Sequence, residues 1–303
     1  RLRFFLSLHM KKILITGGTG LVGSRLTELL INKKHEVNIL TRTPDGSNEY
    51  KWDLSKKSID TEAFKNVDYI IHLAGAGIAD ERWSDQRKKV IIDSRVESAN
   101  LLFSKAKELN IPLKGFISAS GSGYYGAITT SKIFEETDAA GKDFLGEVCE
   151  KWEAAALQFK SLNIPVSILR TGIVLSKTGG ALEKMKTPVI AALGSGKQYM
   201  PWIHIDDLCE MYLHQIEENL EGIYNAVAPE HKTSTDFSKE LAKSISRPYV
   251  GINVPSFMLK LVFGDMAKIL LEGSRISSKK IEKQNFTFRY PILSTGLINL
   301  FKK

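Results

Sequence analysis

The stretch "TGGTGLVG", residues 16–23, decides the fold of this chain because of what stands on either side of it. The run "KKILIT" before it is short, apolar and β-branched, which is typical of a buried strand. The segment "LVGSRLTELLINKK" after it repeats its apolar residues at helical spacing. A strand, a glycine-rich turn and a helix in this order open a βαβ unit of the kind that binds a dinucleotide.

The glycines of this loop have separate tasks in such a unit. Gly17 permits the tight turn, Gly20 lets the backbone approach a pyrophosphate, and Gly23 lets the helix pack against the strand. The helix N-terminus then offers unpaired N–H groups and a partial positive charge to the phosphates. A purely structural turn is the alternative. The cofactor contacts predicted in the loop are Gly17, Thr19, Gly20, Leu21, Val22 and Gly23.

The residue after the second predicted strand, "HEVNIL", indicates which dinucleotide is bound. An NAD site usually has Asp or Glu there, to accept a hydrogen bond from the ribose 2′-hydroxyl. This chain has Leu40 and Thr41, followed at once by Arg42. A guanidinium suits a 2′-phosphate through its charge and its forked donors. The sequence therefore predicts that the cofactor is NADP(H), with NAD as the second choice. Arg25 is a further candidate ligand of the phosphate. The alternative is that Arg42 faces solvent in a loop and binds no cofactor.

Strands and helices alternate along the first two thirds of the chain. Further strands are predicted at "EYKWDL", "VDYIIHLAG", "LKGFISAS", "PVSILR" and "GIYNAV". Helices are predicted at 84–110, 144–163 and 203–216. Because the strands are continuously apolar, both faces of the sheet are expected to be covered. The predicted fold class is α/β, a Rossmann-type doubly wound parallel sheet with a smaller C-terminal substrate-side region.

The expected organisation has a Rossmann domain at residues 10–172, to which strands near 205–228 return. Residues 173–303 are mostly the substrate-side region. The apolar stretch "PSFMLKLVFGDMAKILL", residues 255–271, is interrupted by charges and is expected to form one amphipathic helix. Residues 1–9 are expected to be a disordered extension before Met10, the natural start.

Composition excludes several classes of protein. The chain has 303 residues and a net charge of +8 without a long basic run, and no motif combines basic and aromatic residues for nucleic acid. Its two cysteines, Cys149 and Cys209, are too few for a disulfide framework or a zinc site, so we expect a cytoplasmic protein without a metal. No apolar run approaches the ~20 residues of a membrane span. The expected partner is a small-molecule substrate, with a homodimer left open.

Several motifs together resemble a known family. The motifs "TGGTGLVG", "WDL", "HLAG", "LRTGIVL" and "WIHIDDL" occur in the order typical of extended short-chain dehydrogenases/reductases, the NAD(P)-dependent epimerase/dehydratase superfamily. The later "NAVAPE" and "FTFRYP" resemble an atypical group of epimerase-family proteins with a C-terminal domain of unknown function, here at 249–296. The resemblance implies that Asp53 and Leu54 flank the adenine and that Leu73, Ala74 and Gly75 pass under the cofactor.

The resemblance fails at the usual catalytic residues. The superfamily uses Asn, Ser or Thr, Tyr and Lys, and the Tyr is a general acid or base beside a Lys four residues on. None of the nine tyrosines here has Lys at that spacing. Leu145 and Cys149 fall on the Tyr and Lys positions, and Ser94 falls on the Asn position. Ser120 remains, and we expect it to orient a substrate carbonyl or alcohol.

Other residues are candidates for the missing chemistry. Tyr124, close to Ser120, is the first candidate for the proton donor, and a packed aromatic ring is the alternative. Glu147 is a weaker candidate. Trp202 and Arg170 are expected to line the substrate pocket, and His204 is expected to be a structural partner of Asp206 or Asp207.

The predicted function is therefore that of an NADP(H)-dependent oxidoreductase or a nucleotide-sugar-epimerase-like enzyme without the usual Tyr–Lys pair. A non-catalytic NADP(H)-binding sensor or regulatory protein is the alternative.

Overall fold

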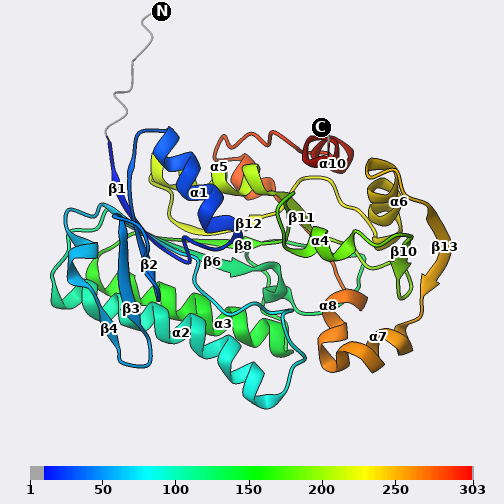
Figure 1. Cartoon of the computed structure of the whole chain (residues 1–303), viewed down its shortest axis with the longest axis horizontal. Helices are drawn as coiled ribbons and strands as arrows, with labels where there is room; N and C mark the ends of the chain where they lie inside the picture. The colour runs from blue at the N-terminus through cyan, green and yellow to red at the C-terminus, as the bar shows by residue number, and fades with distance from the viewer. Residues whose placement is uncertain (1–9, 302–303) are drawn as a thin grey trace, which may run out of the picture.

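The computed structural model describes residues 10–301, so the extension predicted at 1–9 lies outside the described residues. An eight-stranded sheet forms the centre of the molecule (Figure 1). Its strands are β1 (Lys12–Thr16), β2 (Glu36–Thr41), β3 (Glu49–Asp53), β4 (Ser58–Ile59), β5 (Tyr69–His72), β6 (Gly115–Gly121), β8 (Val166–Thr171) and β12 (Gly222–Ala226).

The strand order is β12-β8-β6-β5-β1-β2-β3-β4, and all neighbours are parallel except β3 and β4. The chain runs outward from β1 to β3 and then returns to the other side of β1 with β5. The carboxyl ends of β1 and β5 therefore border the point where the strand order reverses, which is where ligands bind in such sheets. The prediction of a Rossmann-type doubly wound sheet is confirmed.

Two pairs of helices cover the sheet. Helices α1 (Leu21–Asn32) and α5 (Ile205–Glu217) pack on one face, where Leu26, Leu30 and Met211 are fully buried. Helices α2 (Asp85–Glu108) and α3 (Phe144–Leu157) pack on the other face (Figure 1). The sheet is thus shielded on both faces, which explains why its strands read as unbroken apolar runs.

A smaller group of elements, most of them from the second half of the chain, lies at the right of Figure 1. Three two-stranded sheets belong to it, made by β10 with β13, β11 with β9, and β14 with β7. Their bounds are β7 (Ile133–Phe134), β9 (Ile173–Leu175), β10 (Ile190–Leu193), β11 (Trp202–His204), β13 (Tyr249–Val254) and β14 (Arg275–Ile276). The remaining helices are α4 (Ala181–Met185), α6 (Ser234–Ser244), α7 (Ser256–Phe263), α8 (Lys268–Leu271), α9 (Lys279–Glu282) and α10 (Leu293–Phe301).

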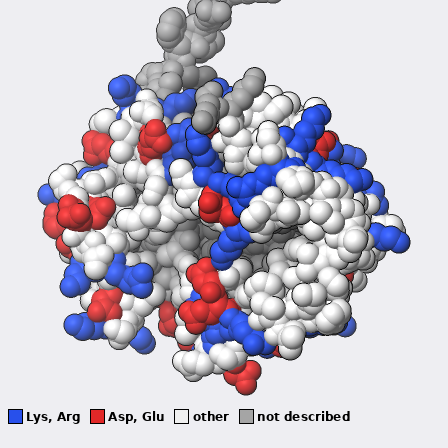
Figure 2. All heavy atoms as spheres, turned by 45° about the vertical axis from the view of Figure 1, so that its right-hand side comes forward, with Lys and Arg blue, Asp and Glu red and all other residues white. Residues whose placement is uncertain are grey.

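The single amphipathic helix predicted at 255–271 is wrong. Helix α7 ends at Phe263 because Gly264 takes a positive φ of 59° with a ψ of −137°, a conformation that does not continue the helix and that glycine adopts readily. A short 3₁₀ turn and α8 follow. Helix α7 exposes Phe257 and Leu261, which retain 70% and 77% of their accessible surface. The wide uncharged area at the right of Figure 2 lies on the side where Figure 1 shows α7 and β13.

The segment "FTFRYP" is fixed to the central sheet through α5. The buried carboxylate of Asp207 accepts hydrogen bonds from the amides of Arg289 and Tyr290, at 2.7 and 2.9 Å. The "WIHIDD" motif therefore anchors the C-terminal region. Among residues 10–301, no helix combines the length and apolar character that crossing a bilayer requires.

Candidate functional site

The glycine loop after β1 has the geometry of a phosphate cradle. Gly17 has a φ of 70°, and its carbonyl accepts a hydrogen bond from the amide of Gly20 at 3.0 Å. A Cβ atom on Gly23 would lie 2.1 Å from the Gly17 oxygen, so only glycine fits there. The turn and the close helix packing predicted for Gly17 and Gly23 thus have a direct structural cause.

Gly20 differs from these two glycines. Its backbone is extended, with φ of −80° and ψ of 177°, and a Cβ atom would meet only the Gly17 oxygen, at 3.3 Å. The fold itself does not require glycine at this position. Helix α1 begins at the next residue without a side-chain cap, so the amides of its first turn have no acceptor in the helix. This uncapped end and the small residue before it fit a pyrophosphate.

The loop after β5 lies directly against the glycine loop. A Cβ on Gly17 would be 3.0 Å from the amide nitrogen of Ala74. The Thr16 hydroxyl accepts hydrogen bonds from the amides of Leu73 and Ala74, both at 3.2 Å. The structure therefore places residues 17–23 beside residues 73–75, the two segments predicted to contact the cofactor from opposite sides of the strand reversal.

A buried histidine supports this junction. The Thr16 hydroxyl lies 2.7 Å from Nδ1 of His72, and Ser98 lies 3.2 Å from Nε2. Burial lowers the pKa of His72 to about 4, so its ring is neutral at physiological pH. His72 ties β1, β5 and α2 together beneath the loops.

The ends of β2 and β3 carry the residues predicted for the adenine side. Arg42 is exposed and forms no hydrogen bond or ion pair with residues 10–301. Arg25 is already engaged, since it donates to Asp206 at 2.8 Å and to Glu28 at 2.7 Å. The side chain of Asp53 accepts from the amide and hydroxyl of Ser55 and so stabilises its own turn. Thr19 is exposed, and Leu21, Val22 and Leu54 are partly buried.

Helix α3 holds no acid or base at the positions where the family has its Tyr and Lys. Leu145 packs over Gly123, whose Cβ would be 3.2 Å away. The Cys149 thiol is buried and donates to the carbonyl of Gly121 at 3.5 Å. Burial raises the pKa of this thiol to about 11, so it stays protonated and unreactive near neutral pH.

Ser120 belongs to a buried polar cluster. It is 3% exposed, and its hydroxyl donates to Oε1 of Glu153 at 2.7 Å. Glu153 also accepts from Nε and Nη2 of Arg170, at 2.8 and 2.9 Å. In the sequence, only an acid on the helix and a basic residue in the next strand hint at this cluster.

Two pocket residues expected from the sequence are not in a pocket. Arg170 is 1% exposed and is bound by Glu153, and Trp202 is fully buried and donates to the carbonyl of Glu230. The expectation that they line the substrate pocket is wrong. Arg170 lies within β8 and Trp202 begins β11, and neighbouring elements of the chain cover both side chains.

The adjacent tyrosines have different surroundings. The ring centroid of Tyr124 lies 3.2 Å from the guanidinium carbon of Arg170, and this side chain is half-buried. The Tyr125 hydroxyl is buried, donates to Asn225 at 2.6 Å and accepts from Arg170 at 3.1 Å. Burial raises the pKa of Tyr125 to about 12. Within the described residues, the hydroxyl of Tyr124 has no hydrogen-bond partner, so Tyr124 is the better candidate for proton transfer.

His204 has a structural place, as expected. Its Nδ1 accepts from the amide of Asp206 at 3.1 Å and caps helix α5, and its ring lies 4.0 Å from that of Tyr290. Burial lowers its pKa to about 4. A side chain held in this way is no candidate for the missing base.

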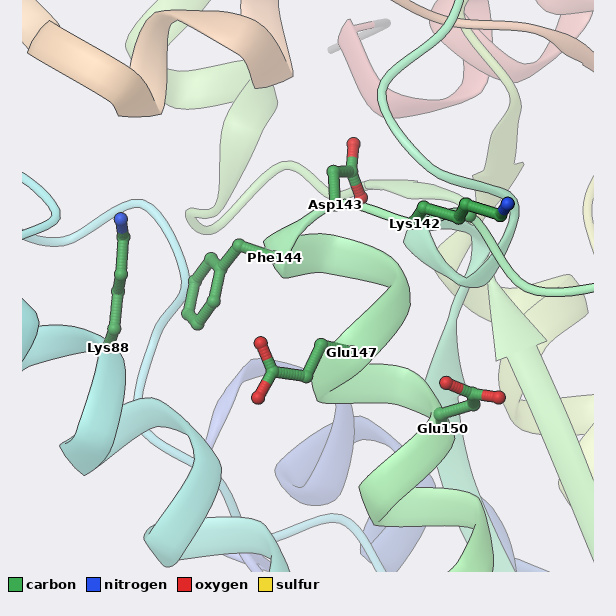
Figure 3. A pocket seen from close by; sticks show the side chains of 7 residues that line it. Lys88, Lys142, Asp143, Phe144, Glu147 and Glu150 are labelled. Carbon is green, nitrogen blue, oxygen red and sulfur yellow. The ribbon is translucent and has the colours of Figure 1, made fainter.

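Glu147 lies on the surface, away from the glycine loop. It borders a cavity of about 420 Å³ and forms an ion pair with Lys151 at 2.6 Å. Figure 3 shows the side chain of Glu147 on α3 directed toward the side of Lys88 of α2, whereas Glu150 points away from Lys88. None of the predicted cofactor contacts lines this cavity. Glu147 is therefore a poor candidate for acid–base chemistry at the cofactor.

Comparison with known proteins agrees with this architecture. The model of the NAD dependent epimerase/dehydratase family matches residues 13–226, and a domain of unknown function, DUF1731, matches residues 254–300. An epimerase family protein of Staphylococcus aureus (strain NCTC 8325 / PS 47) is 34% identical over 304 residues, which cover 97% of this chain and 100% of the relative.

Two solved structures are similar over nearly all of this chain. The human epimerase family protein SDR39U1 (isoform 2), crystallised with NADPH, is 30% identical with a TM-score of 0.87, covering 96% of this chain and 99% of the human chain. A nucleoside-diphosphate sugar epimerase from Corynebacterium glutamicum is 29% identical with a TM-score of 0.79, covering 97% of this chain and 59% of that one. This chain belongs to the NAD dependent epimerase/dehydratase family, as a member with a C-terminal DUF1731 domain.

Proposed function

We propose that this chain is an NADP(H)-dependent oxidoreductase or epimerase-like enzyme that works without the usual Tyr–Lys pair. The observation that carries the proposal is the uncapped glycine cradle, with the unpaired Arg42 at the end of the neighbouring strand. The human relative's crystal structure with NADPH supports the same cofactor class. A 2′-phosphate could pair with Arg42 without breaking another interaction, because this guanidinium forms no hydrogen bond or ion pair with residues 10–301.

Three groups of residues would hold the cofactor. The loop 17–23 would bind the pyrophosphate. The adenine side of the cofactor would contact Arg42, Asp53 and Leu54, and the nicotinamide side would contact residues 73–75. When bound, the cofactor supplies or accepts a hydride. The region 173–303 would close the site from the substrate side. In support, a Cβ on Gly180 would be 2.9 Å from Leu21, at the start of α1.

The residues proposed for proton transfer lie at the end of β6. Tyr124 would exchange the proton, with the guanidinium of Arg170 against its ring. The hydrogen of Ser120 is directed to Glu153, so we assign Ser120 a positioning role: it fixes the Glu153–Arg170 pair beneath Tyr124. The substrate would be a small carbonyl or alcohol compound, with sugar nucleotides as one class to be tested.

The Tyr124→Phe variant tests the proton donor. Its kcat is expected to fall by roughly 10²–10⁴, the usual effect of losing a general acid or base, with little change in NADPH affinity. Tyr125→Phe is the matched control. It should lower thermal stability, because the buried partners Asn225 and Arg170 lose a hydrogen bond. An unchanged kcat in Tyr124→Phe would remove this tyrosine from the mechanism.

The Arg42→Ala variant tests cofactor choice. The unmutated protein is expected to bind NADPH at least about tenfold more tightly than NADH, which corresponds to about 1.4 kcal/mol. Arg42→Ala should lose most of this preference by weakening NADPH binding alone, as measured by nucleotide fluorescence. Arg25→Ala is the control and should keep the preference, since Arg25 is bound by Asp206 and Glu28. A variant with an undiminished preference for NADPH would exclude Arg42 as the phosphate ligand.

A binding protein without turnover is the second candidate, favoured by the partly buried Leu145 and the buried Cys149 at the positions of the family's Tyr and Lys. Absorbance at 340 nm, followed with NADPH and a panel of carbonyl compounds and sugar nucleotides, separates the two functions. Substrate-dependent oxidation of NADPH supports the enzyme. Tight NADPH binding without turnover on any member of the panel supports the sensor or regulatory protein.

A further inference from the structure

Arg95, on helix α2, is a buried cation without a carboxylate partner in the described part of the chain. It is 9% exposed, and its Nη1 donates to the backbone carbonyls of Ala76 and Ile91, both at 2.9 Å. Its Nε is buried and has no hydrogen-bond partner within residues 10–301. Nη2 likewise donates to none of these residues. By contrast, Arg170, which is 1% exposed, is bound on two nitrogens by Glu153.

The guanidinium of Arg95 lies at the cofactor side of the sheet. A Cβ on Gly75 would be 3.0 Å from its Cζ, and the ring centroid of Trp152 on α3 lies 4.8 Å from the same atom. Cys149 is close by: burial sets the raised pKa of its thiol, and the charge of Arg95 is among the smaller influences that oppose the rise. Arg95 thus bridges the end of β5 and the part of α3 where the family pattern has Lys.

The sheet order assigns this place to one half of the dinucleotide. Arg42 follows β2 and Asp53 ends β3, on one side of the strand reversal, so the adenine half belongs there. Gly75 follows β5, and Gly121, which receives the Cys149 hydrogen bond, ends β6 on the other side. The nicotinamide half must extend over β5 and β6, and Arg95 lies in that half.

The unpaired donors call for an oxygen acceptor. A guanidinium has five N–H groups and accepts no hydrogen bond; the two backbone carbonyls occupy Nη1 of Arg95, and its buried Nε and its Nη2 have no acceptor among residues 10–301. Burial lowers the pKa of Arg95 to about 10, so the group is still charged at neutral pH. Its Trp152 contact fixes the plane of the guanidinium but satisfies none of the N–H groups. A ligand with hydroxyl oxygens on this side of the site would satisfy them.

We propose that Arg95 binds the hydroxyl oxygens of the nicotinamide ribose of NADP(H). In the family pattern a Lys on α3 supplies a cation on this side of the site; here Cys149 occupies that position, and Arg95 supplies the cation from α2. This inference rests on the proposed function, since it requires a dinucleotide in the glycine cradle. It makes Arg95 a cofactor-binding residue with no counterpart among the usual catalytic residues of the family.

Calorimetric titration with three nucleotides tests the assignment. NADPH carries both ribose groups, 2′-phospho-ADP-ribose lacks only the nicotinamide, and 2′,5′-ADP lacks the second ribose and its phosphate as well. In Arg95→Met, which keeps the apolar stem against Trp152, the Kd values of the first two should rise by about tenfold to a hundredfold. The Kd of 2′,5′-ADP should stay unchanged. The thermal midpoint should move by no more than about 4 °C, because no buried ion pair is broken.

Arg87→Met is the matched control on the same helix. Arg87 also donates to the loop after β5, at the Gly77 carbonyl, but it has Glu81 as an ionic partner. The Arg87→Met variant should bind all three nucleotides with unchanged affinity.

Three results would overturn the assignment while leaving the proposed function intact: unchanged affinities in Arg95→Met, an equal loss for all three nucleotides, or a loss confined to NADPH. An equal loss for all three nucleotides would mean that Arg95 only stabilises the loop after β5. A loss confined to NADPH would mean that Arg95 contacts the nicotinamide rather than the ribose. An unmutated protein that binds none of the nucleotides would overturn the proposed function itself, and this inference with it.

Discussion

NADPH binding by a Gly20→Val variant is expected to fall below detection while the protein stays folded. The valine side chain would occupy the space beside the uncapped N-terminus of α1, where the pyrophosphate must lie. The backbone at Gly20 is extended, and a Cβ there meets only the Gly17 oxygen, at 3.3 Å. Fluorescence titration with NADPH, together with a thermal unfolding curve, measures both parts of the prediction.

Gly23→Val provides the contrast, because there a Cβ would lie 2.1 Å from the same oxygen. This variant should lose stability as well as binding, since α1 can no longer pack against the loop. A Gly20→Val protein that binds NADPH with unchanged affinity would show that the cradle is elsewhere.

The Glu153→Ala variant is expected to lose about 3–5 kcal/mol of the free energy of unfolding. Glu153 and Arg170 retain 5% and 1% side-chain exposure, so removal of the carboxylate leaves an uncompensated buried guanidinium. It also takes away the acceptor of the Ser120 hydroxyl. Urea denaturation at neutral pH measures the loss.

Two further variants identify the cause of that loss. Glu147→Ala, on the same helix, breaks only an exposed pair with Lys151 and should cost less than about 1 kcal/mol. Replacing both buried charges, with Glu153→Leu and Arg170→Met together, should recover much of the stability that Glu153→Ala loses. Equal losses for Glu153→Ala and Glu147→Ala would contradict the importance of the buried pair.

Local sequence was sufficient to predict the central sheet. The inner strands such as β1, β5 and β6 are buried on both faces, so their apolar runs were unmistakable, and the glycine loop determined the first βαβ unit. The two-residue edge strand β4 was not predicted. The break in the late helix at 255–271 could not be predicted, because it depends on the positive φ of one residue, Gly264. Short strands such as β7 and β14 pair over about 140 residues, and periodicity carries no sign of such contacts.

The candidate site was only partly predictable, for a similar reason. The sequence brings Gly17 and Gly23 into one loop, and the proximity of this loop to residues 73–75 follows from the strand order. The burial of a side chain by elements that are distant in the sequence could not be predicted from local patterns. Arg170 therefore looked like a pocket residue, although Glu153, 17 residues earlier, holds it in the interior. The isolation of Arg95 became apparent only when Gly75, Trp152 and α2 were seen together.

Calorimetric titration of the unmutated protein with NADPH and NADH tests the central claim most directly. We expect one NADPH to bind per chain, with a Kd at least about tenfold lower than that of NADH, because the unpaired Arg42 meets the 2′-phosphate. The absence of saturable binding for either nucleotide, or equal affinities for both, would contradict the account.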